Sequence, residues 1–290
     1  MGSPMRRVSA FLHRHSGVRL GGLLSAPLAW LVIVYLGSLA VLFVTAFWSV
    51  DSFSGVLDKT FTLQNFQDVI TDEFYRRVAF RTIVVAAAVT VIDVLIAFPI
   101  AFAMAKVVHP KWRSLLVVLV LMPLWASYLV KAYAWRTILK PGGLGDSLLE
   151  RVGLSSPGYS LTSVVIVLAY LWLPYMILPI YAGLERLPDS LLEASGDLGA
   201  QAGRTFRAVV IPLAFPAVVA GSIFTFSLSL GDYIAVQLVG GPSQLLGNLI
   251  YEKLGTANNL PLAAALGTIP VIVMIGYLAL VRRTGALDEI

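Results

Sequence analysis

Side chains that commonly carry catalysis or bind metals are scarce in this chain. Its 290 residues include no cysteine and three histidines. The lack of cysteine excludes disulfides, thiolate metal sites and cysteine nucleophiles. The histidines lie beside basic residues and not at the spacing of metal ligands: His13, His15 and His109. We therefore predict no metal site and no catalytic residue.

Acidic and aromatic side chains are the remaining candidates. Asp93 is the single acid in an otherwise uncharged run, 82–105, and an ionisable residue inside a membrane span is by default a functional candidate. The alternative is a bond to a neighbouring helix or a place in a subunit interface. Further candidates for a gate or a cation-stacking surface are Trp125, Tyr128, Trp172, Tyr175 and the pair Asp232 and Tyr233. Aromatic belts at membrane interfaces are the alternative for the rings.

The composition places these residues in a helical membrane protein. Hydrophobic residues make up 58% of the chain and charged residues 13%, against about 45–50% and 25% in soluble domains. A bilayer-spanning helix needs about 20 apolar residues. Six runs meet this need and are the predicted spans: 27–48, 82–105, 115–134, 161–183, 212–230 and 262–281. A soluble enzyme is excluded, and a membrane-embedded enzyme is a remote alternative because no acids or histidines cluster at one membrane face.

The distribution of basic residues predicts the orientation of these spans. If the N-terminus is cytoplasmic, 12 of the 21 Lys and Arg residues lie on the cytoplasmic side and 9 on the other side. The positive-inside rule favours this orientation, in which both termini are cytoplasmic. The first apolar run is too long for a signal peptide, so we expect an uncleaved span. The predicted organisation is a tail at 1–26, a transmembrane domain at 27–283 and a tail at 284–290. The net charge of +5 reflects topology and gives no reason to expect nucleic acid.

Two segments between the spans have recognisable helix signals. The loop 185–211 is predicted to be cytoplasmic, with Pro188 at the first helical position of a short helix that ends at Gly196 and Gly199. A second helix, 200–210, then leads into the fifth span at Pro212. The segment 233–251 is rich in glycine, so we expect an external loop with a short helix or a shallow re-entry.

The loop 185–211 resembles the signature of the permease subunits of bacterial ATP-binding-cassette (ABC) importers. That signature reads Glu-Ala-Ala, three residues, Gly, nine residues, Ile, one residue, Leu-Pro. The matching residues are Glu193, Ala194, Ser195, Gly199, Val209, Ile211 and Pro212, with Ser195, Val209 and Ile211 as departures. The resemblance implies an all-α, type I importer (MetI-like) permease fold in the bacterial inner membrane. It also implies a coupling helix that binds separate ABC ATPase subunits.

A second stretch narrows the resemblance and its implications. Residues 122–135, together with Gly231-Asp232-Tyr233, resemble the PotB-type spermidine/putrescine permeases, and the likeness covers about 61–280. A polyamine path should offer carboxylates and aromatic faces. The alternatives are another solute of the same importer class: an opine, a quaternary amine or an inorganic anion. A channel would not need the loop signature.

The resemblance also implies which partners and cofactors the chain uses. Expected partners are a second permease of similar fold, an extracytoplasmic solute-binding protein and the lipid bilayer. This chain has no Gly-x-x-x-x-Gly-Lys-Ser/Thr phosphate loop, so ATP and Mg²⁺ would be used by the partner ATPase and no cofactor would bind here.

Overall fold

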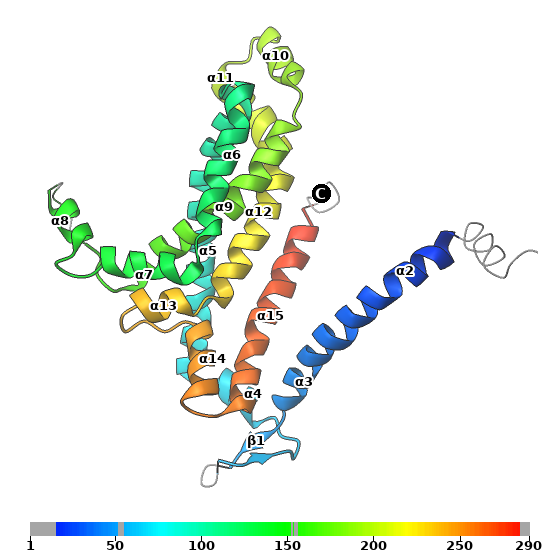
Figure 1. Ribbon diagram of the computed structural model, residues 1–290, viewed down its shortest axis with the longest axis vertical. Helices are drawn as coiled ribbons and strands as arrows, with labels where there is room; N and C mark the ends of the chain where they lie inside the picture. The colour runs from blue at the N-terminus through cyan, green and yellow to red at the C-terminus, as the bar shows by residue number, and fades with distance from the viewer. Residues whose placement is uncertain (1–15, 52–54, 152, 154–155, 285–290) are drawn as a thin grey trace, which may run out of the picture.

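Helices form nearly all of the chain. The computed structural model describes residues 16–51, 55–151, 153 and 156–284. Figure 1 shows long helices side by side, with α10 (Asp189–Asp197) at one end of the bundle and α14 (Leu246–Gly255) towards the other. The predicted tails 1–26 and 284–290 lie partly outside the described residues, as do His13 and His15; residues 16–26 belong to the helix α2 (Ser16–Trp30).

Three long helices pack together as the core of the bundle. They are α5 (Glu73–Phe102), α9 (Leu161–Glu185) and α12 (Ile211–Gly231). Small residues let α9 and α12 approach closely: a Cβ atom on Gly221 would lie 2.8 Å from the Met176 sulfur, and one on Gly183 would lie 2.5 Å from the Cβ of Ala217. Close approach at small residues is how membrane helices gain packing energy without a hydrophobic driving force.

The first span stands apart from this core. It consists of α2, the π-helical turn η1 (Leu31–Leu36) and α3 (Gly37–Thr45), and it leans away from the other helices in Figure 1. The described part of this span is held to the rest of the protein at its end: α3 packs against α15, and just after α3 the side-chain amide of Asn65 donates to the carbonyls of Ala46 and Trp48, at 2.9 and 2.7 Å. Most of its apolar surface is therefore exposed, as expected of a helix that faces lipid or another subunit.

The remaining elements connect and flank these helices. They are β1 (Ser49–Val50) paired antiparallel with β2 (Leu57–Asp58), α4 (Gln64–Thr71), η2 (Ala103–Val107), α6 (Pro110–Trp125), α7 (Tyr128–Ile138), α8 (Leu144–Glu150), α11 (Ala202–Thr205), η3 (Phe206–Val210), α13 (Ile234–Val239) and α15 (Leu260–Arg282). The helices α13 and α14 confirm that 233–251 is a loop with short helices.

The number of spans agrees with the prediction if one broken helix pair is counted as one. Among the described residues, five helices are long and apolar enough to cross a membrane, and α6 with α7 makes a sixth, bent by 86°. The predicted third span, 115–134, is thus not straight. Ala126 and Ser127 adopt extended backbone and start α7 in a new direction. Lys131 and Arg136 lie on α7. Because α7 turns away from the direction of α6, these two charged residues do not extend the apolar helix α6.

Candidate functional site

Four predicted site residues meet where α12 gives way to α13. Tyr128, Trp172, Asp232 and Tyr233 line a pocket of about 300 Å³, which we call the aromatic pocket. They belong to α7, α9 and the segment between α12 and α13. The bend between α6 and α7 brings Tyr128 to this place, so three distant parts of the sequence surround one carboxylate.

The carboxylate of Asp232 is held in a fixed orientation. The hydroxyl of Tyr128 donates to its Oδ2, and the backbone N–H of Ala235 donates to its Oδ1 at 2.9 Å. Asp232 is buried, although it lines the pocket. A carboxylate offers about four acceptor positions, so these two bonds leave capacity for a donor on a bound molecule.

The aromatic residues of the pocket wall are Tyr128, Trp172 and Tyr233, and each contacts another ring. The rings of Tyr128 and Trp172 stack with their centroids 5.8 Å apart, and Tyr175 lies against Trp172 at 5.9 Å. Tyr233, the residue after Asp232, stacks on Tyr251 with ring centroids 4.9 Å apart. The faces of such rings attract an organic cation within about 6 Å. The site can therefore offer both a negative charge and aromatic surface.

Two other predicted residues of the substrate path lie elsewhere. Asp93 is fully buried in α5, and no described residue bonds its carboxylate oxygens. Trp125 lies at the end of α6 and is 79% exposed. The structure does not bring either residue into the aromatic pocket, so their part in transport stays a prediction.

The signature loop folds as a short helix with a glycine at its end. Glu193, Ala194 and Ser195 lie in α10, which confirms the predicted helix, although Pro188 precedes the first helical residue instead of occupying it. Gly199 has a φ of +79°. Its N–H bonds the Gly196 carbonyl at 2.8 Å, and the next N–H bonds that of Ser195 at 3.1 Å. These two bonds form a Schellman motif, whose left-handed residue is usually glycine.

The helix α10 is attached to the core near both of its ends. Lys106 Nζ donates to the Leu187 carbonyl and to Asp189 Oδ1, both at 2.6 Å. The hydrogen bond from Lys106 holds the pKa of Asp189 below its usual range. At the other end the hydroxyls of Ser195 and Thr205 lie 2.9 Å apart. Ser195, a departure from the importer signature, thus has a bond that an alanine could not make.

The chain after α10 enters the core without interruption. The helices α11, η3 and α12 form one continuous helix, so the predicted second helix 200–210 begins slightly later, at Ala202. Pro212 has no N–H to offer the carbonyl of Ala208, four residues earlier, and this explains the π-helical turn η3 at that position. Phe206 packs edge-on against Phe98 and Phe102 of α5, at 5.5 and 5.4 Å.

Sequence reasoning missed the residues that hold α10 in place. Lys106 lies 83 residues before Asp189, and no local pattern pairs them. Thr205 has the same difficulty, although the serine in the signature was a signal that a hydroxyl partner could be near. In the aromatic pocket, Ser227 and Leu228 complete the wall and lie one turn before Gly231 on α12.

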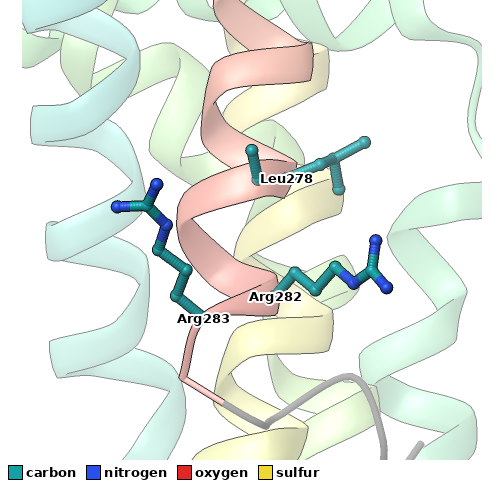
Figure 2. Close-up of a pocket in the computed structure, with 4 residues that line it drawn as sticks. Leu278, Arg282 and Arg283 are labelled. Atoms are coloured by element: carbon teal, nitrogen blue, oxygen red, sulfur yellow. The ribbon is translucent and has the colours of Figure 1, made fainter.

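A wider pocket lies away from these sites. Leu278, Ala279, Arg282 and Arg283 border a space of about 650 Å³ at the end of α15, and Figure 2 shows the two guanidinium groups extending to different sides of the helix. It contains no acid and none of the predicted site residues. Within the described part of the chain there is also no group of three or more His, Cys, Asp or Glu residues able to hold a metal.

Comparisons with known proteins give the family. Residues 77–285 match the family described as binding-protein-dependent transport system inner membrane component. The inner membrane ABC transporter permease protein YdcU of Escherichia coli (strain K12) is 42% identical, over 98% of this chain and 95% of that protein. The spermidine/putrescine transport system permease protein PotB of Haemophilus influenzae is 35% identical, over 70% of this chain and 72% of its own. PotB of Escherichia coli (strain K12) is 32% identical, over 84% of this chain and 90% of that protein.

Solved structures agree on the fold. A bacterial ABC transporter involved in the import of the acidic polysaccharide alginate matches with a TM-score of 0.68 at 16% identity, over 96% of this chain and 99% of that chain. The MetNI methionine ABC transporter matches with a TM-score of 0.56 at 16% identity, over 72% of this chain and 93% of that chain. The predicted MetI-like permease fold is therefore confirmed, and this chain belongs to the binding-protein-dependent inner membrane components, the multi-pass permease subunits of ABC importers.

Proposed function

We propose that this permease imports a small organic cation, most specifically a polyamine such as spermidine or putrescine. The observation that carries the proposal is the aromatic pocket, where the carboxylate of Asp232 lies among the rings of Tyr128, Trp172 and Tyr233. A polyamine is a chain of ammonium groups on an apolar stem, so it needs both features. The similarity to two PotB permeases, at 32–35% identity, supports the same class of solute.

The coupling of transport to ATP would take place at the opposite end of the core. There α10 would be a coupling helix seated on a partner ABC ATPase, with Glu193, Ala194, Ser195 and Gly199 at the contact and Pro212 at the entry to the core. Closure of the ATPases around ATP and Mg²⁺ would move α10 and favour one of two states of the spans. This chain would bind no cofactor itself.

The remaining arrangement follows from this placement. The end of the bundle that holds α10 and Lys106 would be cytoplasmic together with both tails, 1–26 and 284–290, while 27–283 spans the inner membrane. The aromatic pocket would then face the extracytoplasmic side, where a solute-binding protein delivers the solute. One chain supplies one such loop, so a second permease of similar fold would complete the pathway, most simply as a heterodimer.

Competition for uptake tests the proposed solute. The complete complex in proteoliposomes, loaded with ATP, would be given labelled putrescine together with unlabelled spermidine, betaine, an opine or phosphate. We expect spermidine to compete most strongly. If no cation competes and putrescine is not taken up, the polyamine assignment is wrong, whereas the family assignment is unaffected.

A further inference from the structure

The signature helix α10 is joined by covalent chain to only two of the three core helices. It follows α9 through residues 186–188 and leads into α12 through residues 198–201. The third core helix, α5, is not adjacent to α10 in the chain, because α6 to α9 lie between them. Since α5 packs against both α9 and α12, any movement of the core as a unit must also carry α5. A specific contact between α5 and α10 would serve this purpose.

Lys106 makes such a contact. It lies in η2, the π-helical turn that continues α5, and its ammonium group reaches the loop before α10 and the first residue of α10. The two acceptors are the carbonyl of Leu187 and the carboxylate of Asp189, both 2.6 Å from Nζ. They fix the start of α10 to the end of α5.

The side chains of Lys106 and Asp189 differ in exposure, and this difference indicates which of the two depends more on their contact. The side chain of Asp189 is 72% exposed, whereas that of Lys106 is 8% exposed. An exposed ion pair is screened by solvent and contributes little. A buried ammonium group, by contrast, needs its acceptors because it has lost most of its water. Lys106 is therefore the member of the pair that depends on the contact.

We propose that Lys106 is a positioning residue that makes α5 follow α10, so that the ATP-driven movement of α10 reaches all three core helices. This proposal rests on the proposed role of α10 as a coupling helix. Phe206, which lies in η3 and packs edge-on against Phe98 and Phe102, fixes α5 to the start of α12 in the same region. Lys106 adds the polar contact that reaches α10 itself.

The first test measures coupling in the complete complex in proteoliposomes. In Lys106→Met the side chain keeps its length and loses its charge and donors. We expect the number of ATP molecules hydrolysed per solute imported to rise at least about fivefold. A factor of five corresponds to about 1 kcal/mol, the low end of typical coupling free energies. Lys106→Arg should retain most coupling because it keeps a cation near both acceptors. Lys111→Met is the control, since Lys111 is exposed and has no bond from its side chain to any described residue.

The second test reads the contact itself, without transport. Because the chain lacks cysteine, nitroxide labels can be placed on Val107→Cys and Ser190→Cys, two exposed positions beside the contact. Labelled protein that accumulates in the membrane as the unaltered chain does should show strong dipolar coupling between the labels by electron paramagnetic resonance. Lys106→Met should weaken this coupling and broaden the distribution of distances between the labels. Asp189→Asn, at an exposed side chain, should give a smaller effect in the same direction because the Leu187 carbonyl remains as an acceptor.

The outcomes separate the two proposals. If Lys106→Met leaves both the ATP-to-solute ratio and the dipolar coupling as in the unaltered chain, the positioning role is wrong. If Lys106→Met does not accumulate in the membrane, Asp189→Asn decides the question, and an unchanged dipolar coupling there overturns the role. A failure of the unaltered complex to import any solute would refute the proposed function alone, because the label measurement needs no transport.

Discussion

The two ends of the core are built in opposite ways. At the α10 end, the signature residues follow one another in the chain from Glu193 to Pro212, and most are exposed, available to a partner. At the α13 end, the aromatic pocket gathers residues from three distant segments around the buried carboxylate of Asp232. A surface that docks on another subunit can be one contiguous segment, whereas a pocket that surrounds a small solute must be assembled by the fold.

The largest expected effect is at the α10 end. Gly199→Val would place a β-branched residue at a φ of +79°, which costs about 1–2 kcal/mol or more and distorts the Schellman motif. We expect ATP-dependent uptake to be lost while the amount of chain in the membrane is unchanged. Gly203→Ala is the control, because Gly203 is helical with open space around it. Normal uptake by Gly199→Val would show that this turn does not contribute to coupling.

A smaller, more selective effect is expected at the α13 end. Asp232→Asn keeps an oxygen to accept from Ala235 but removes the charge. We expect the KM for putrescine uptake to rise about tenfold, equivalent to about 1.4 kcal/mol. Asp68→Asn, at an exposed acid in α4, should leave the KM as it is. An unchanged KM in Asp232→Asn would mean that Asp232 serves only to begin α13.

The close contact between α9 and α12 links the two ends, and its disruption should affect stability. Gly221→Ala places a methyl group 2.8 Å from the Met176 sulfur, and such overpacking typically costs about 1–3 kcal/mol. We expect a lower thermal midpoint in detergent. Gly276→Ala, where a Cβ atom meets nothing within 4 Å, should not lower it. Equal midpoints for the two variants would contradict tight packing at Gly221.

The smallest effect concerns pH at the α10 end. Lys106, and more weakly Arg113, hold the pKa of Asp189 below its ordinary value of about 3.9. The contact is therefore complete above that value and is lost only as the pH falls through the lowered pKa. Nitroxides on Val107→Cys and Ser190→Cys should keep the same dipolar coupling from pH 8 to pH 5. A loss of coupling near pH 6 would show that another group controls the contact.

The difference between the two ends also explains what could be predicted from the sequence. Span number, the helix α10 and its terminal glycine follow from local hydropathy and helix-end signals. The meeting of Tyr128, Trp172 and Asp232 depends on a bend of 86° between α6 and α7, where Ala126 and Ser127 gave no sign of a break. The bond from Lys106 to Asp189 likewise depends on how α5 packs beside α9, which no local pattern contains.

One paired measurement tests most directly whether solute selection and ATP coupling lie at opposite ends of the core. The complete complex with Asp232→Asn, and separately with the mild variant Gly199→Ala, would be assayed for the KM of putrescine uptake and for ATP hydrolysed per putrescine imported. We expect Asp232→Asn to raise the KM at an unchanged ratio, and Gly199→Ala to raise the ratio at an unchanged KM. If both variants change the same quantity, the proposed division between the two ends is wrong.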